Sequence, residues 1–211
     1  MNGIVQNMLK MVRKGYRGID MTRIYFVRHA QPEHGYADDR TRPLTREGTE
    51  NTALVLETLM DKNIDIFYSS PYKRSMDTIR STAEYYGMQI ITDERLRERE
   101  CGKDGNSHGM FAKRWADLTY HEEGGESIRM VQDRNMEALH EILYTCQGKR
   151  VVIGTHGTAL SSILNYYNPK FGCDDFLRII DWMPYIIELD FEGERLIRMT
   201  ELAHIEKPFQ P

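Results

Sequence analysis

Two histidines each follow a short apolar run, and histidine is the side chain whose charge changes most readily near neutral pH. His29 comes just after residues 24–27, and His156 comes just after residues 151–153. Apolar runs of this length are typical of buried strands. Open α/β sheets bind ligands beyond the carboxyl ends of their strands. We therefore expect both histidines to lie at the same edge of a sheet, where they could act on a ligand.

Three further segments between these histidines contain residue types that suit phosphate chemistry. They are Ser70-Pro71-Tyr72-Lys73-Arg74, Leu96-Arg97-Glu98-Arg99-Glu100-Cys101-Gly102 and Gly124-Gly125-Glu126-Ser127. Phosphoryl transfer needs fixed cations and hydrogen-bond donors, one nucleophile and one proton carrier. A neutral imidazole can attack phosphorus and form a phosphohistidine. From its position after the first strand, His29 is the predicted nucleophile.

Together these segments resemble the histidine phosphatase superfamily, in its phosphoglycerate-mutase-like branch with an Arg-His-Gly motif. The resemblance runs from about residue 23 to about residue 202 and keeps the family's order of motifs. Arg28 and Arg74 can each present a planar guanidinium group to phosphate oxygens. His156, protonated beside a phosphate, would add a donor, and the backbone N–H of Gly157 could approach closely. The resemblance implies the same four positions for the phosphate pocket, and we add Gln31 as a candidate contact.

The resemblance also implies the proton carrier. Glu98 aligns with the glutamate of the family's Leu-x-Glu segment, so it is predicted to protonate the leaving oxygen and then to activate water. Glu100 is the alternative carboxyl. Glu126 and Ser127 match the family's Gly-Gly-Glu-Ser segment, and they either contact the substrate or only begin a helix.

Two departures from the family pattern affect the expected activity. Ala30 replaces the usual glycine after the nucleophile, which adds a methyl group to a crowded turn but removes no reactive group. The 31–43 loop lacks the pattern of true phosphoglycerate mutases, and residues 93–126 are too few for their larger substrate cover. We therefore predict a metal-independent phosphomonoester hydrolase. The alternatives are a mutase and a phosphoester-binding module without turnover.

Other phosphate enzymes lack support in the sequence. No cysteine has an arginine six positions later, as a thiolate phosphatase loop requires, and no Gly-x4-Gly-Lys-Ser/Thr loop occurs. The remaining histidines show no metal-ligand spacing; they are His34, His108, His121, His140 and His204. We expect no metal and no cofactor, and a small phosphorylated molecule as the substrate.

Composition sets the class of protein. The chain has 211 residues, of which 40% are hydrophobic and 28% charged, as in globular domains. A net charge of −4 provides no general attraction to nucleic acid, and no run is apolar enough to span a membrane. Three widely spaced cysteines do not suggest a disulfide framework, so a cytoplasmic location is the simplest expectation. Residues 1–20 are expected to form a flexible extension before a catalytic domain at 21–211.

Helical and strand patterns alternate along the chain, which predicts a three-layer α/β/α sandwich. Its central sheet should be mostly parallel, with at least one antiparallel strand from a C-terminal hairpin. The predicted strands are 23–28, 64–69, 88–92, 150–154, 185–189 and 195–202. The predicted helices begin at Thr45, at Ser70 with Pro71 in the first turn, near Met110, at Ser127, near Thr158 and near Asp174.

Overall fold

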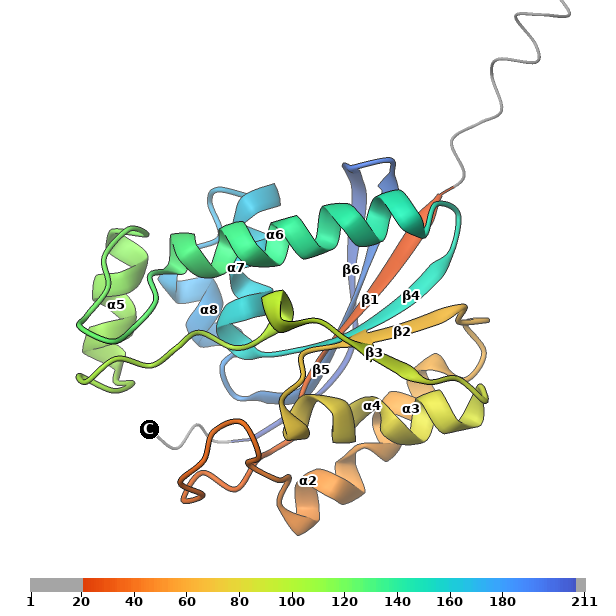
Figure 1. The fold of residues 1–211 in the computed structure, drawn as a ribbon, viewed down its shortest axis with the longest axis horizontal. Helices are drawn as coiled ribbons and strands as arrows, with labels where there is room; N and C mark the ends of the chain where they lie inside the picture. The colour runs from red at the N-terminus through yellow and green to blue at the C-terminus, as the bar shows by residue number, and fades with distance from the viewer. Residues whose placement is uncertain (1–20, 208–211) are drawn as a thin grey trace, which may run out of the picture.

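The computed structural model describes residues 21–207, and these form a six-stranded sheet with helices on both faces (Figure 1). The expected N-terminal extension lies outside the described residues. The strands are β1 (Thr22–Arg28), β2 (Ile66–Ser69), β3 (Ile90–Thr92), β4 (Arg150–Thr155), β5 (Trp182–Glu192) and β6 (Arg195–Glu206). The helices are α2 (Arg46–Asn51), α3 (Ala53–Leu59), α4 (Lys73–Tyr85), α5 (His108–Ala116), α6 (Ile128–Thr145), α7 (Gly157–Tyr167) and α8 (Cys173–Ile179), with a 3₁₀ turn η1 (Glu94–Leu96).

The strand order is β3-β2-β4-β1-β5-β6. The first four strands are parallel, whereas β5 runs antiparallel to both of its neighbours, β1 and β6. This confirms the predicted three-layer sandwich with a mostly parallel sheet.

Alternation along β1 produces two separate cores, because successive side chains of a strand point to opposite faces. Ile24 and Phe26 pack in the core under α5, α6, α7 and α8. Tyr25 and Val27 pack in the other core, under α3 and α4. Figure 1 shows these two sets of helices on opposite sides of the sheet. A strand that is buried on both faces needs apolar side chains at successive positions. This explains the continuous apolar run at residues 24–27.

The carboxyl ends of three neighbouring parallel strands lie level with one another. Arg28 at the end of β1 pairs with Thr155 at the end of β4, and Ser69 at the end of β2 pairs with Gly154. The chain then continues into His29, Ser70 and His156. This register brings segments that are far apart in sequence to one edge of the sheet.

Several predicted boundaries were wrong. Helix α4 begins at Lys73 rather than at Ser70, because Tyr72 is the capping residue and the Ser70 hydroxyl serves other partners. The predicted helix from Thr45 is correctly capped, since the Thr45 side chain accepts a bond from Gly48 N, but it divides at Thr52 into α2 and α3. The C-terminal hairpin is longer at both ends than predicted.

The segment between η1 and α6 is held by a buried ion cluster instead of by a long regular element. The Glu122 carboxylate pairs with Arg99 at 3.3 Å and also with Arg114. Arg99 and Arg114 both donate to the side chain of Asn106, each at 3.0 Å. Burial raises the pKa of Glu122, but the bonds from these arginines outweigh it and bring that pKa to about 2. The cluster therefore stays charged. It ties Arg99 and Glu122, which lie before and after α5 in the sequence, to Arg114 on α5.

None of the helices within residues 21–207 has the length and apolar composition needed to cross a membrane. The three cysteines are all unpaired.

Candidate active site

The two strand-end histidines lie next to each other, with ring centroids 5.3 Å apart. His29 is 6% exposed and His156 is fully buried. Their backbones continue the sheet, since His29 N donates to Thr155 O at 3.1 Å. The expectation that β1 and β4 bring both histidines to one edge of the sheet agrees with this geometry.

The hydrogen bonds of His29 define which ring nitrogen is free. Nδ1 lies 2.8 Å from the carbonyl oxygen of Ala30. Because a carbonyl can only accept, Nδ1 carries the proton, and Nε2 keeps its lone pair. Burial, and then the charges of Arg74 and Arg28, hold the pKa of His29 well below its usual value. The imidazole is therefore neutral near pH 7, as a nucleophile must be.

Ala30 fits in the turn after the nucleophile without exposure to solvent. Its N–H donates to the Thr78 hydroxyl at 2.9 Å, and that hydroxyl in turn donates to Arg74 O at 2.7 Å. The methyl group that replaces the family's hydrogen is therefore accommodated, and the turn is tied to α4.

Arg28 is 5% exposed and only partly satisfied. One terminal nitrogen, Nη1, donates to Ile179 O at the end of α8 at 2.5 Å, whereas Nε has no partner among the described residues. Burial lowers the pKa of Arg28 to about 10, against the opposing effect of Glu98 and Asp181. A buried guanidinium with a free donor is suited to bind an anion.

Gly157 begins α7 directly against Arg28. A side chain there would place its first carbon 3.4 Å from three atoms of the guanidinium group. Glycine therefore lets the start of the helix pack on this cation. Of the N–H groups in the first turn, those of Thr158 and Ala159 donate to the Glu98 carboxylate.

Arg74 lies in the first turn of α4, as predicted, and is 3% exposed. Its guanidinium donates to Asp39 O at 2.6 Å and pairs with the Asp39 carboxylate at 3.2 Å. It also lies over the ring of Tyr72, which contacts the His156 ring at 5.2 Å between centroids. Burial lowers the pKa of Arg74, while Asp39 and Glu98 act in the opposite sense.

The prediction that His156 becomes a protonated donor beside a phosphate stays a prediction. Burial, with the charges of Arg74 and His29, holds its pKa well below the usual value, so the ring is neutral in this structure. Ser70 Oγ accepts from Tyr72 N and can donate to His156 Nε2 at 2.7 Å. In that arrangement Nδ1, which is buried and without a partner in the described residues, carries the proton. A neutral His156 can then still donate a hydrogen bond to a phosphate.

Glu98 is half-buried and lies beside the start of α7. Its carboxylate accepts from Thr158 N at 3.0 Å and Ala159 N at 3.2 Å. It also accepts from Arg99 N at 2.7 Å. A carboxylate offers about four acceptor positions. Glu98 therefore keeps one for a proton or a water while lying beside the segment that carries His156.

The other predicted contacts have structural partners. Gln31 accepts from Thr45 at the start of α2 through both its backbone and its side chain. Ser127 caps α6 by accepting from Met130 N at 3.1 Å. Glu126 pairs with Arg97 at 2.8 Å and with Arg134 at 2.9 Å.

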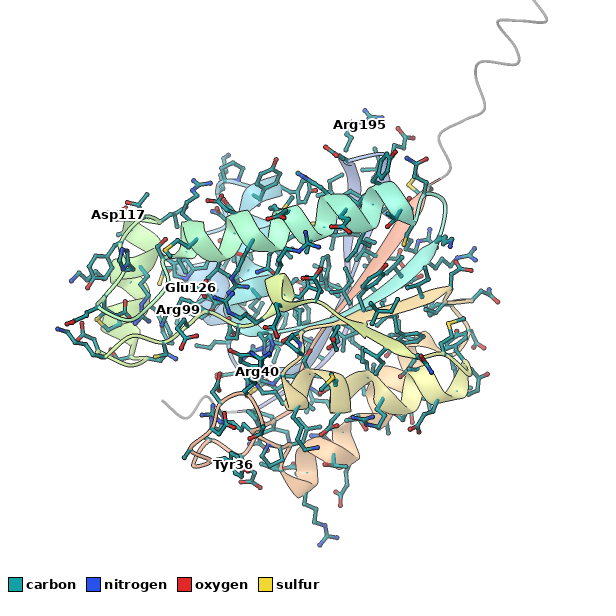
Figure 2. All side chains as sticks on the ribbon, viewed as in Figure 1. Tyr36, Arg40, Arg99, Asp117, Glu126 and Arg195 are labelled. Carbon is teal, nitrogen blue, oxygen red and sulfur yellow. The ribbon has the colours of Figure 1, made fainter. Side chains whose placement is uncertain are left out.

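Sequence reasoning missed several residues that shape the site. Asp39 and Tyr72 hold Arg74, and Ser70 orients His156. The segment that contains Ser70 and Tyr72 was identified from the sequence. The roles of these two residues follow from their contacts with His156, which is distant in sequence. Figure 2 shows Arg40, on the 31–43 loop, on the α4 side of the molecule, and Arg99 and Glu126 on the α6 side.

A family model for the histidine phosphatase superfamily (branch 1) matches residues 24–195. The chain belongs to this superfamily. A phosphoserine phosphatase 1 from Hydrogenobacter thermophilus is 26% identical, over 74% of this chain and 83% of its own length. A 2,3-bisphosphoglycerate-dependent phosphoglycerate mutase from Parvibaculum lavamentivorans is 28% identical, over 81% of this chain and 91% of its own.

Solved structures show the same fold. A mycobacterial glucosyl-3-phosphoglycerate phosphatase superimposes with a TM-score of 0.70 over 86% of this chain and 97% of its own, at 19% identity. A phosphoserine phosphatase from Entamoeba histolytica gives a TM-score of 0.70 over 87% and 96%, also at 19% identity. The superfamily resemblance inferred from the motifs is confirmed, and so is the fold.

Proposed function

We propose that this protein is a metal-independent phosphomonoester hydrolase that forms a phosphohistidine on His29. One observation carries the proposal: a neutral buried imidazole with a free Nε2 lies beside two buried guanidinium groups, of which Arg28 has an unpartnered donor. Membership of the histidine phosphatase superfamily supports the same chemistry.

In the first step, Nε2 of His29 attacks phosphorus and the bond between phosphorus and the ester oxygen breaks. Arg28, Arg74, His156 Nδ1–H and the backbone N–H of Gly157 are proposed to bind the three non-bridging oxygens. Protonated Glu98 transfers its proton to the leaving oxygen, so that an alcohol departs. The imidazole needs no base, because its attacking nitrogen carries no proton.

In the second step, the Glu98 carboxylate removes a proton from water as the water oxygen attacks phosphorus. The bond between phosphorus and Nε2 breaks, which releases inorganic phosphate and restores the neutral imidazole. Glu98 regains its proton and is ready for the next turnover. The same carboxyl thus serves as acid and then as base.

Independence from metal ions is part of the proposal. Its support is that residues 21–207 contain no group of three His, Cys, Asp or Glu side chains arranged to hold a metal ion. The cations and donors listed above are proposed to stabilise the developing charge instead. A cytoplasmic location is also proposed, because all three cysteines are unpaired.

The proposal is tested by release of phosphate from p-nitrophenyl phosphate in EDTA, with wild type and His29→Ala compared. The wild type should turn over, and His29→Ala should lose at least about 1,000-fold in kcat, since removing a covalent nucleophile removes the reaction path. Equal activity in both proteins would refute the assignment of His29. Trapping of radioactive phosphate on the wild type after acid-free quenching provides a second readout.

A mutase is the second candidate, because relatives of both kinds match this chain. The two activities differ in the fate of the phosphoryl group. With 3-phosphoglycerate as substrate, a mutase produces an isomeric phosphoglycerate, whereas a hydrolase produces inorganic phosphate. We expect inorganic phosphate.

A further inference from the structure

Glu98 lies on a stretch of backbone that has no helix or strand of its own. The 3₁₀ turn η1 ends at Leu96, and Arg97 is already extended. The stretch from residue 97 to residue 100 follows this turn and includes Arg99, which belongs to the ion cluster around Glu122. Something other than regular secondary structure must therefore fix the position of Glu98.

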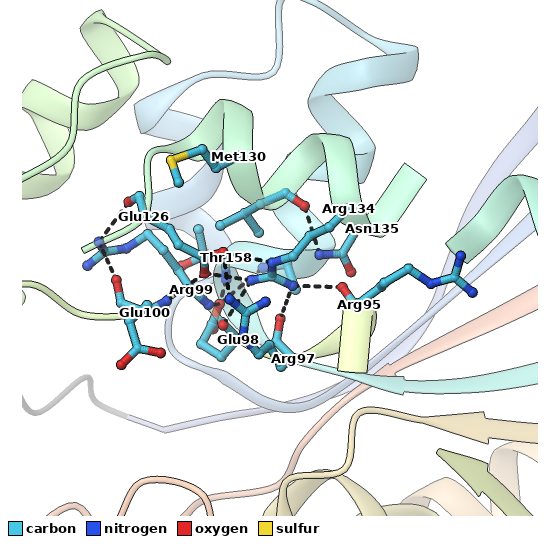
Figure 3. Close-up of polar contacts among 12 residues, drawn as sticks. Arg95, Arg97, Glu98, Arg99, Glu100, Glu126, Met130, Arg134, Asn135 and Thr158 are labelled. Carbon is cyan, nitrogen blue, oxygen red and sulfur yellow. Dashed lines mark hydrogen bonds and ion pairs between the residues drawn. The ribbon is translucent and has the colours of Figure 1, made fainter. Parts of the chain in front are cut away.

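The side chain of Arg134, on α6, donates to three backbone carbonyls of the segment around Glu98 (Figure 3). Its Nη1 donates to the carbonyl oxygens of Arg95 and Arg97, both at 2.7 Å. Its Nη2 donates to the carbonyl oxygen of Glu98 at 3.0 Å. Three carbonyls within four consecutive residues are thus held by one guanidinium group.

Glu126 completes the arrangement. Its carboxylate accepts from Arg134 Nε at 3.0 Å and from Arg134 Nη2 at 2.9 Å. All five donors of the guanidinium group are therefore used. The same carboxylate accepts from Arg97 at 2.8 Å and from the backbone N–H of Glu100 at 2.8 Å.

This pair is shielded from solvent and charged. The side chains of Arg134 and Glu126 are 13% and 10% exposed. Burial raises the pKa of Glu126, but the bonds from Arg134 and Glu100 N outweigh it, so the pKa is lowered overall. The pair therefore keeps its bidentate form in the neutral pH range.

Glu98 is consequently fixed at two places. Its backbone is bound to α6 through Arg134, and the backbone just beyond it is bound through Glu126. Its carboxylate is bound to the first turn of α7, beside His156. We propose that Arg134, held by Glu126, is a positioning residue that fixes the proton carrier Glu98 relative to the phosphate. This inference rests on the proposed function, in which Glu98 protonates the leaving oxygen.

The test uses two esters that differ in their need for a proton. The p-nitrophenolate ion is a good leaving group without protonation. The alkoxide released from glycerol 2-phosphate must receive a proton as it leaves. For Arg134→Lys, which keeps the charge but not the planar fork, kcat/KM on glycerol 2-phosphate should fall about 100-fold, as expected for a misplaced catalytic group. On p-nitrophenyl phosphate it should stay near the wild-type value. A role confined to stability would lower both values equally, and that result would overturn the proposal.

Arg95→Gln is the matched control. Arg95 lies in the adjoining turn η1, and its side chain pairs with Glu137 at 3.1 Å and Glu141 at 2.8 Å on the same helix and with Asp93 at 2.6 Å. None of these bonds goes to the backbone of residues 97–100. Loss of the Arg95 side chain should change neither ester's kcat/KM. If Arg95→Gln gives the same selective loss as Arg134→Lys, the specific role of Arg134 is wrong.

Two more variants separate the possible failures. If circular dichroism shows that Arg134→Lys does not fold, Glu126→Gln is measured instead, because it keeps the shape of the partner of Arg134 and removes its charge. A loss of kcat/KM confined to glycerol 2-phosphate supports the proposal. An equal loss on both esters overturns it. Glu98→Gln should show the larger selective loss. If Glu98→Gln is selective and Arg134→Lys is not, only the positioning role fails. If Glu98→Gln lowers both esters equally, the proton-carrier role in the proposed function fails.

Discussion

At the scale of single residues, the site depends on imidazoles that are kept neutral by their surroundings. His29 and His156 are almost completely buried, and both lie within the electric field of Arg28 and Arg74. Both effects disfavour a second positive charge. The neutral form suits a nucleophile, but the same surroundings make the folded protein sensitive to acid.

The direction of this acid sensitivity follows from the two pKa values. In the unfolded chain the two imidazoles have a pKa of about 6.5, and in the folded protein their pKa lies well below that value. Below pH 6.5, the unfolded state therefore binds more protons. As the pH falls below about 6.5, the free energy of unfolding should decrease by up to about 1.4 kcal/mol per pH unit for each histidine. Above about pH 6.5, protonation of these histidines should cost no stability.

The measurement is the urea midpoint of unfolding at about pH 5 and about pH 7.5. His156→Gln, which keeps a neutral polar side chain, should show a smaller difference between the two pH values than the wild type. An unchanged difference would mean that His156 titrates normally in the folded protein.

At the scale of secondary-structure elements, the close contact between α4 and β4 places Arg74. A first side-chain carbon at Gly154 would lie 2.7 Å from Ser69 Oγ and 2.9 Å from Ser75 Oγ. These two hydroxyls also bond to each other at 3.1 Å. Ser75 is the neighbour of Arg74, so the absence of a side chain at Gly154 allows the first turn of α4 to approach the end of the sheet.

Gly154→Ala should therefore destabilise the fold by about 1–3 kcal/mol, the usual effect of overpacking a dense interior. Displacement of α4 should also raise KM for p-nitrophenyl phosphate. The control is Gly109→Ala in α5, where, apart from the adjoining residues and the backbone of the helix itself, nothing lies within 4 Å of the added carbon. This variant should be equal to or slightly more stable than the wild type, because alanine favours a helix. Urea unfolding and steady-state kinetics check both variants.

At the scale of the whole molecule, a chain with net charge −4 concentrates buried cations at one edge of its sheet. Arg28 and Arg74 lower the pKa of His29, and burial lowers the pKa of Arg28 itself to about 10, so positively charged groups lie close together here. A bound phosphate would supply the missing partner. Under the proposed function, binding of that anion would stabilise the fold.

Inorganic phosphate should accordingly raise the melting temperature of the wild type. At a concentration about 100 times its Kd, the expected stabilisation is about 2.7 kcal/mol. Arg28→Met should lose most of this shift, since it removes the buried guanidinium that has a free donor. Sodium sulfate and sodium chloride at matched ionic strength separate a bound anion from general salt effects. A shift of the same size in Arg28→Met would remove Arg28 from the phosphate pocket.

The sequence by itself determined the superfamily, the layered fold and the candidate reactive residues at the strand ends. Buried parallel strands require continuous apolar runs, and the residues just after such runs must emerge at one edge of the sheet. That local rule is sufficient to select His29 and His156. Thr45 and Ser127 were recognised as helix starts for a similar reason, because a capping side chain bonds to backbone within three residues of itself.

Only the tertiary structure decided which groups touch. Asp39 meets Arg74 across 35 positions, and Arg134 meets Glu98 across 36. The start of α4 was misplaced because Ser70, a good capping residue locally, bonds instead to His156, which is 86 positions away. The pKa of His156 is likewise set by distant segments, since burial and the charges of Arg74 and His29 lower it. Contacts of this kind depend on how separate segments pack in three dimensions, so local sequence patterns do not predict them.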